Sequence, residues 1–296
     1  MLIIVVLVVL GLCLGSFVNA LVWRLHIQQG VLISKTHKKA VDNSDRHFNH
    51  IFGLKAANPY SILNGRSMCP NCHHELAFVD LVPVLSWILL RGKCHYCGKP
   101  ISWQYPLVEL LVPFLFVFSY LAWPLGFSNI GVFSFVLWSV FLICFVALGV
   151  YDLRWFLLPD RIVYPLIVLA IVEVIIKASL FGGGWSVINE ALWGIVFIAG
   201  LFYLLFLASK GMWIGLGDVK LAVVLGLLVG GPLRALLLIF IASTLGSVVA
   251  LPMLVRGRAK MTSQIPFGPF LLAATILVVL FGNNITDWYN NFFYLR

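Results

Sequence analysis

Charged residues are scarce in this chain. Of its 296 residues only 10% are charged, whereas 61% are hydrophobic and the mean hydropathy is +1.02. A soluble globular domain has about 25% charged residues, so this scarcity excludes the soluble class and predicts an integral membrane protein. The first apolar run, residues 1–23, also lacks a basic n-region and a small-residue cleavage site. We expect it to be retained as a membrane span rather than removed as a signal peptide.

Polar stretches are equally rare, and apolar runs that approach the length of a bilayer span fill most of the chain. They lie at roughly 1–23, 104–123, 130–150, 161–181, 187–208, 216–231, 233–255 and 266–283. The run at 216–231 is short and rich in glycine, so a count of seven or nine stays open. The predicted fold class is an all-α polytopic membrane protein with about eight transmembrane helices.

Positive charges are lacking on one side of the predicted membrane topology. Seventeen of the 20 Lys and Arg residues fall in the 24–103 segment and in three turns on the same side. The positive-inside rule places this side, with Asp152, Asp160 and Asp218, in the cytoplasm and both termini outside. Basic loops beside anionic lipid also account for the net charge of +9, so the lipid bilayer is the expected partner and no nucleic acid is implied.

Cysteines are few, but four of the six form two C-x-x-C pairs, Cys69 with Cys72 and Cys94 with Cys97. Four thiolates from two tight turns can close a tetrahedron around Zn²⁺, and a cytosolic location argues against disulfides. No thioredoxin-like βαβ pattern surrounds the pairs, which disfavours a redox role. A closed four-cysteine site leaves no position for water, so the predicted zinc is structural.

The insert also contains three histidines near the cysteines and a long polar stretch before them. His73, His74 and His95 lie in or beside the cysteine pairs and are expected to face solvent, because the cysteines already complete the ligand set. The polar stretch 35–58 has no helical or strand period and is predicted to be a mobile loop. The expected domains are a first transmembrane helix (1–23), a cytoplasmic zinc-binding insert (24–103) and a transmembrane domain (104–296).

Two acidic residues inside apolar runs have simple structural interpretations. Glu173 is followed at i+4 by Lys177, which predicts a structural ion pair. Glu109 lies in the first turns of the second predicted helix, where a carboxylate gains from the helix N-terminus. For Glu109 a functional role and a dipole partner both stay open.

Outside the insert, three aspartates fall on the predicted cytoplasmic face. Asp160 follows Pro159 and precedes an apolar run, as an N-cap does. Asp152 is expected to end a helix, where a negative charge is mildly unfavourable, so capping does not explain it. Asp218 follows a Gly-Leu-Gly segment and either caps a helix or takes part in chemistry. Two carboxylates at a partly dry boundary would share a proton, one activating water and the other polarising a peptide carbonyl, as in aspartic proteases.

Six stretches of the sequence, in order, resemble the type IV prepilin peptidases of bacteria. They are GSFVNALVWRL (15–25), SILNGRSMCPNC (61–72), DLVPVLSWILLRGKCHYCGKPIS (80–102), YPLVELL (105–111), DLRWFLLPDRIVYPL (152–166) and GLGDVKL (215–221). The resemblance implies an enzyme of the bacterial inner membrane that removes the leader peptide of type IV prepilins or pseudopilins at the cytoplasmic face. It also implies N-methylation of the new amino terminus with S-adenosylmethionine as methyl donor.

The resemblance extends to individual residues. Asp152 and Asp218 match the catalytic aspartates of the family. The supporting residues that it implies are Asp160, Gly215, Gly217 and Lys220, and the residues associated with methyl transfer are Gly92, Lys93 and Glu109. The methyltransferase rests on resemblance alone, because no Gly-rich loop lies between a predicted strand and helix to hold a nucleoside.

The sequence departs from the family in two places, and two other functions compete. Gln104 stands where the family often has Arg, and 35–58 resembles an insertion. One alternative is a peptidase alone, with the zinc insert a structural or substrate-orienting scaffold. Another is a non-catalytic assembly or chaperone subunit that grips pilin helices, although retention of both Asp152 and Asp218 argues against it.

Overall fold

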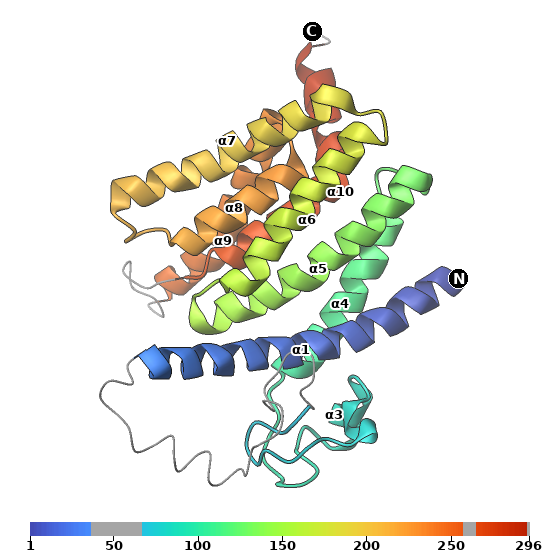
Figure 1. Cartoon of the computed structure of the whole chain (residues 1–296), viewed down its shortest axis with the longest axis vertical. Coiled ribbons are helices and arrows are strands. Elements are labelled where there is room, and N and C mark those ends of the chain that lie inside the picture. Colours follow the sequence, from blue (N-terminus) through green and yellow to red (C-terminus); the bar gives the residue numbers. More distant parts are fainter. Residues whose placement is uncertain (37–66, 257–264, 295–296) are drawn as a thin grey trace. The chain divides into compact units, whose positions relative to one another are not determined.

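The structure, a computed structural model, describes residues 1–36, 67–256 and 265–294. The described residues are mostly helical, and their β-pairing is limited to two isolated bridges, Met68 with Glu75 and Lys93 with Pro100. The chain divides into two compact units, Met1–Val117 and Phe118–Arg296 (Figure 1). The loop predicted at 35–58 lies, from residue 37 onward, outside the described residues.

The first unit combines two apolar helices with the cysteine-bearing insert. Its α1 continues beyond the predicted end at residue 23, because the following residues include no proline. Where α1 and α4 cross, their backbones are close: a Cβ at Gly11 would lie 2.5 Å from Cα of Pro113. Glycine therefore permits this crossing. The elements are α1 (Leu2–Thr36), η1 (Phe78–Leu81), α3 (Leu85–Leu89) and α4 (Gln104–Leu121), which continues into the second unit.

The second unit is a helical bundle around a short central helix. This helix, α8, packs against α6, α7, α9 and α10, and its Leu221, Ala222 and Leu225 are fully buried. Gly226 of α8 and Gly194 of α7 allow the two backbones to touch, since a Cβ at Gly194 would lie 2.2 Å from the Gly226 carbonyl oxygen. The helices are α5 (Asn129–Trp155), α6 (Asp160–Ser179), α7 (Gly184–Ser209), α8 (Leu216–Val229), α9 (Pro232–Val255) and α10 (Gly268–Tyr294).

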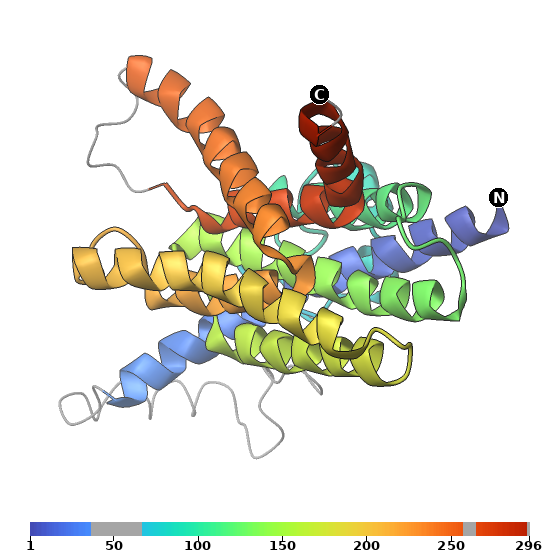
Figure 2. The ribbon, with the colours of Figure 1, turned by 90° about the horizontal axis from the view of Figure 1, so that it is seen from above.

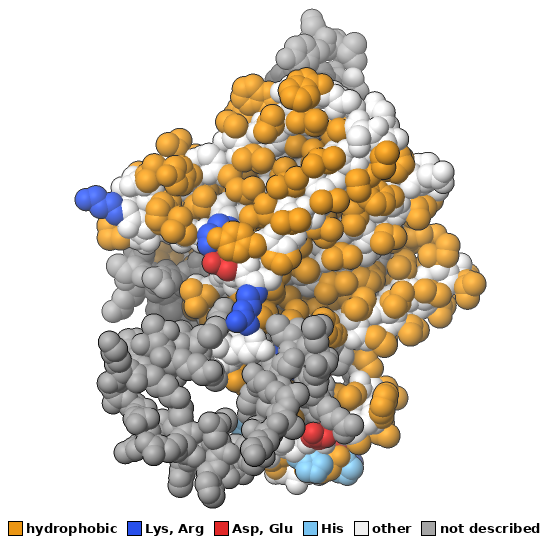
Figure 3. Space-filling model, viewed as in Figure 1, with side chains coloured by type: hydrophobic (Ala, Val, Ile, Leu, Met, Phe, Trp, Pro, Cys, Tyr) orange, Lys and Arg blue, Asp and Glu red, His pale blue; other side chains and the backbone are white. Residues whose placement is uncertain are grey.

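The described helices confirm the predicted class of a polytopic all-α membrane protein. Seven of them are long and apolar enough to cross a membrane. The exception among the predicted spans is α8, which has 14 residues and corresponds to the short glycine-rich run. Hydrophobic side chains cover the helices in the space-filling view, and charged side chains gather in small areas (Figure 3). One helix, α9, leans away from the layer formed by α5 to α8 (Figure 2).

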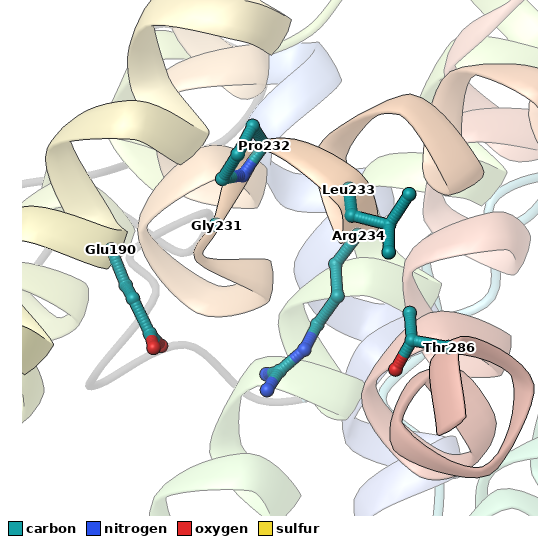
Figure 4. A pocket seen from close by; sticks show the side chains of 6 residues that line it. All are labelled: Glu190, Gly231, Pro232, Leu233, Arg234 and Thr286. Carbon is teal, nitrogen blue, oxygen red and sulfur yellow. The ribbon is translucent and has the colours of Figure 1, made fainter. Parts of the chain in front are cut away.

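The second unit also contains a cavity of about 160 Å³ at the C-terminal end of α8. The side chains of Glu190 and Arg234 extend toward the same space from α7 and α9 (Figure 4). Asp218 lies at the opposite end of α8, so this cavity is separate from the predicted catalytic residues. It is lined by Glu190, Gly231, Pro232, Leu233, Arg234 and Thr286.

Candidate active site and metal centre

Asp152 lies in the last turn of α5, and its side chain is directed into the second unit. The residue is only 5% exposed, and its Oδ2 atom has no hydrogen-bond partner among the described residues. Phe156 ends the helix in a left-handed conformation (φ 54°) and donates its backbone N–H to the Asp152 carbonyl at 2.8 Å. A non-glycine residue in this conformation is strained, and the strain occurs directly beside a buried carboxylate.

Asp218 lies in the first turn of α8, three residues after the N-cap residue Gly215. Its carboxylate lies near the backbone of Gly215: a Cβ at Gly215 would lie 3.8 Å from Asp218 Oδ2. Asp218 is therefore not the N-cap itself, and the N-cap residue of α8 has no side-chain cap hydrogen bond. Its side chain is partly buried.

The bundle brings Asp152 and Asp218 close enough for their carboxylates to interact electrostatically. The two residues come from the C-terminal end of α5 and the N-terminal end of α8, so both lie at the same end of the second unit. Two like charges in a partly dry environment favour a state in which the pair carries one proton. This is the arrangement that acid–base activation of a water molecule requires.

Gly268, the first residue of α10, is a third component of this site that sequence reasoning missed. Its backbone N–H interacts with the Asp152 carboxylate, although the contact does not meet the full geometry of a hydrogen bond. A Cβ at this position would lie 2.5 Å from Asp152 Oδ2, a distance that requires the carboxylate to move. The only sequence signal was the Phe-Gly-Pro stretch that opens the last helix.

Of the two glycines before Asp218, the second has a clear structural reason. A Cβ at Gly217 would lie 3.2 Å from Cβ of Leu158, in the turn between α5 and α6. Glycine thus lets the start of α8 pack against the segment that follows Asp152. Gly215 has ordinary extended backbone angles (φ −80°, ψ 154°), and its carbonyl accepts the backbone N–H of Asp218 at 3.1 Å.

The structure corrects the predicted role of Asp160. The N-cap residue of α6 is Pro159 and makes no side-chain cap bond; Asp160 is the next residue, and both its carboxylate oxygens accept hydrogen bonds from Lys220 at 2.8 and 2.9 Å. The Lys220 ammonium also lies 5.0 Å from the centre of the Tyr164 ring. These contacts connect the start of α6 to α8 two residues beyond Asp218.

The four cysteines of the insert come together as predicted. The thiols of Cys69, Cys72, Cys94 and Cys97 all lie within 4.8 Å of one another, and the sulfurs of Cys69 and Cys97 are 4.0 Å apart. Sulfur ligands at about 2.3 Å from a tetrahedral zinc ion are about 3.8 Å apart. The set therefore fits a four-coordinate zinc ion with little adjustment.

Each cysteine pair is held by a turn of the same design. In each turn the backbone N–H four residues after the first cysteine donates a hydrogen bond to the carbonyl of that cysteine. His73 donates to Cys69 and Gly98 donates to Cys94, both at 2.9 Å. Both returning residues have positive φ, 56° for His73 and 67° for Gly98. His73, His74 and His95 are exposed, as predicted.

Asp80 connects the segment before α3 to the second cysteine turn. Its side chain, 7% exposed, accepts from the backbone N–H of Ala77 and the hydroxyl of Tyr96, each at 3.1 Å, and lies 3.3 Å from Nδ1 of His95. Partial loss of water contact, together with the bond to Asp80, raises the pKa of Tyr96. The phenol therefore stays protonated and remains a donor to this carboxylate.

The three residues associated with methyl transfer by resemblance have different surroundings. Gly92 has φ +67°, and a Cβ there would lie 2.9 Å from the Trp87 ring; its N–H bonds to Trp87 O and its carbonyl accepts from Ile101. Lys93 is exposed in the adjacent turn. Glu109 is buried in α4. Packing thus accounts for Gly92, and neither of its backbone groups is available to a nucleoside.

The other acidic residue in an apolar run behaves as predicted. Glu173 and Lys177 form an ion pair at 2.6 Å within α6. This pairing removes Glu173 from the candidates for chemistry.

Comparisons with known proteins agree with this division of the chain. Residues 9–123 match the model of the bacterial peptidase A24 N-terminal domain, and residues 139–251 match that of the type IV leader peptidase family. A prepilin leader peptidase/N-methyltransferase of Stutzerimonas stutzeri is 33% identical, covering 96% of this chain and 92% of its own length. A protein of the same name from Xanthomonas campestris pv. campestris is 34% identical over 97% of this chain and 94% of its own. No solved structure matches the chain significantly.

Proposed function

Because this chain belongs to the type IV leader peptidase family, we propose that Asp152 and Asp218 are the catalytic pair of an aspartyl endopeptidase. Its substrates are type IV prepilins or pseudopilins, whose leader peptide it removes. The observation that carries the proposal is that the end of α5 and the start of α8 place the two carboxylates within electrostatic range of each other. The two residues belong to different helices, and local sequence rules do not bring them together.

The chemistry follows from a pair that holds one proton. The ionised carboxylate takes a proton from a water molecule, and the water oxygen bonds to the scissile carbonyl carbon. The protonated carboxyl group polarises and then protonates the carbonyl oxygen. Collapse of the tetrahedral intermediate breaks the C–N bond, the nitrogen leaves as a protonated amine, and the pair again holds one proton.

The supporting residues hold the pair in place. The ion pair between Asp160 and Lys220 fixes the start of α8 against α6, and Gly217 allows the same helix start to contact Leu158. The backbone of Gly268 contacts Asp152 from α10. Acid–base chemistry of this kind needs the catalytic side chains to be held within about 0.5 Å of their productive positions.

The four cysteines of the insert are proposed to bind one zinc ion that stabilises the insert. With four thiolates bound, a tetrahedral ion has no open position for water or substrate, so its contribution is to folding. The domain boundaries 1–23, 24–103 and 104–296 remain part of this proposal, with the insert as the region associated with methyl transfer.

The second activity, N-methylation of the new amino terminus, is supported by the names of the relatives. The donor that such names imply is S-adenosylmethionine. Gly92 has both backbone groups engaged within the insert, so its backbone does not offer a free group to this donor. A peptidase without methyltransferase activity would give a product lacking the 14 Da of one methyl group.

The membrane orientation completes the proposal. The chain is a multi-pass protein of the bacterial inner membrane, and we place the insert and the aspartate pair on the cytoplasmic side. Seventeen of 20 basic residues fall on that predicted side, which supports this orientation. The basic leader of a prepilin would then reach the pair from the cytoplasm.

Single replacements of the two aspartates test the catalytic pair. Asp152→Asn and Asp218→Asn should each lower the rate of leader removal by about 10⁴-fold, because asparagine neither takes up nor releases a proton. The double variant should be no worse, since the two acids act as one unit. Leader removal is measured on a synthetic prepilin in reconstituted membranes.

Two controls make this test specific. Asp287→Asn removes an exposed acid from α10 and should leave the rate unchanged. Methyl transfer to a pre-cleaved pilin should survive in all of these variants, which shows that the protein is folded. Substantial cleavage by Asp218→Asn would return this residue to a purely structural role at the start of α8.

A further inference from the structure

The zinc-binding insert carries a hydrophobic surface that its own fold does not cover. Between Phe78 and Leu89 six large apolar side chains are exposed. They belong to η1, to its C-cap residue Val82 and to α3, all outside the candidate membrane spans. The most exposed are Phe78 at 93%, Val79 at 73%, Leu89 at 69%, Ile88 at 57% and Leu85 at 53%.

Polar and apolar groups in this segment are arranged opposite to those of a water-soluble domain. Asp80, next to the two most exposed residues, is the one that turns inward to accept bonds from Ala77 and Tyr96. The hydrophobic neighbours Phe78 and Val79 turn outward. Contiguous apolar patches of this kind mark interaction or membrane surfaces.

The segment is anchored at the level of a membrane span. The backbone N–H of Val84 donates to Oε2 of Glu109 at 2.7 Å, and Glu109 lies in α4, whose span begins at Gln104. At 1.5 Å per residue Glu109 is about 7 Å along α4 from this start. The turn before α3 is therefore held beside the second turn of α4, a helix long and apolar enough to cross a membrane.

Backbone strain at the same turn shows how firmly it is held. Val84 has φ +61°, a conformation that β-branched residues rarely adopt and that persists only when the surroundings enforce it. Glu109, itself 8% exposed, supplies the acceptor that enforces it. The anchor is thus a specific contact between the insert and α4.

The neighbourhood of the segment favours lipid as the occupant. Trp103, directly before α4, is 67% exposed, and Leu107 and Leu110 continue the exposed apolar surface along α4. Tryptophan is enriched at the membrane–water interface. Two exposed cations, Arg91 and Lys93, also follow α3 closely. Such cations are attracted to anionic headgroups.

We propose that residues 78–89 form an interfacial segment that enters the bilayer leaflet beside the first turns of α4, with Glu109 as its anchor. Interfacial segments of this kind bury their apolar face about 5–10 Å into the boundary between headgroups and acyl chains. The depth of Glu109 along α4 matches this range. The insert is then attached to the membrane by this segment as well as by the helices at its two ends.

Photo-crosslinking of the full chain in vesicles of phosphatidylethanolamine and phosphatidylglycerol tests the proposal. A benzophenone amino acid is introduced singly at Phe78, Ile88 or Leu89, with Leu110 as a lipid-exposed reference and Lys99 as a water-exposed one. The yield of lipid adducts, measured by mass spectrometry, should be within about twofold of that at Leu110 and about tenfold above that at Lys99.

Two other results would overturn the assignment. Adduct yields equal to those at Lys99 mean that the segment stays in water. Crosslinks to residues 118–296 or to another protein, in place of lipid, mean that a protein surface covers it.

A matched pair of variants tests the anchor. With the crosslinker at Ile88, Glu109→Ala removes the acceptor for Val84 and should reduce lipid adducts several-fold. Glu109→Gln retains an acceptor oxygen and should preserve them. Retained zinc verifies in both cases that the insert is folded, and unchanged adducts in Glu109→Ala would contradict the role of Glu109.

Discussion

The metal centre and the aspartate pair are assembled in different ways. The cysteines most distant in sequence, Cys69 and Cys97, are 28 positions apart, and each pair is shaped by a turn that its own few residues form. Asp152 and Asp218 instead lie on two helices, and a third helix contributes Gly268. The zinc site therefore depends on local turns and metal, whereas the aspartate pair depends on how α5, α8 and α10 pack.

Removal of metal should have the largest effect, and it should be confined to the insert. Binding of a structural zinc ion contributes about 10–16 kcal/mol to folding in small zinc domains. After chelation, limited proteolysis should cut the full chain between residues 67 and 103 and spare residues 118–256.

The other two cysteines provide the control for this prediction. Cys13→Ser and Cys144→Ser should retain one zinc ion per chain, because both residues lie in apolar helices and neither belongs to the group of four cysteines. An insert that remains resistant to protease without zinc would show that the turns fold without the metal.

A single methyl group at α10 should affect the aspartate pair strongly. In Gly268→Ala the new Cβ would lie 2.5 Å from Asp152 Oδ2, so the carboxylate has to move. Displacement of a catalytic group by about 1 Å lowers the rate by about 10²-fold. We expect kcat to fall by this factor while KM is preserved, since the substrate-binding surface is unchanged. Single-turnover cleavage of a prepilin peptide measures both.

Gly200→Ala is the matched control, because a Cβ at Gly200 meets no atom within 4 Å. It should leave both constants unchanged. Full activity in Gly268→Ala would separate this glycine from the catalytic pair and attribute the close approach to helix packing alone.

The contact between α6 and α8 should have a moderate effect. Lys220→Met removes the ion pair with Asp160 and the contact with Tyr164, both of which are partly exposed. Exposed pairs contribute little to stability, so we expect about a two- to fivefold lower kcat and no measurable change in melting temperature. Lys210→Met, which removes an exposed cation nearby in the sequence, should be neutral. An equal loss in both variants would indicate a general effect of charge.

The smallest effect is expected at the second cysteine turn. In Gly98→Ala the new Cβ meets no atom within 4 Å, but the alanine has to adopt φ +67°. This backbone conformation costs a non-glycine residue about 1 kcal/mol of folding free energy. Zinc affinity, measured by competition with a chelator, should fall about fivefold. His73 adopts the same conformation in the first turn, which shows that the cost is tolerated. A complete loss of zinc would mean that Gly98 has a further role.

Local patterns allowed much of this architecture to be predicted from the sequence. The cysteine spacing indicated the metal cluster, the i+4 spacing indicated the pair of Glu173 with Lys177, and apolar runs indicated the helices. Asp160 was assigned to a cap because local rules consider only its neighbours, whereas its partner Lys220 lies on another helix. Gly268 was missed for the same reason, since nothing near it in the sequence refers to Asp152.

The length of α8 has a consequence for where its ends lie. Its 14 residues extend over about 21 Å, whereas the hydrocarbon core of a bilayer is about 30 Å thick. Because α8 packs against α6, α7, α9 and α10, these longer helices and not lipid fill the remaining thickness. At least one end of α8 therefore lies inside the hydrocarbon layer, where the surrounding helices decide how much water reaches a side chain.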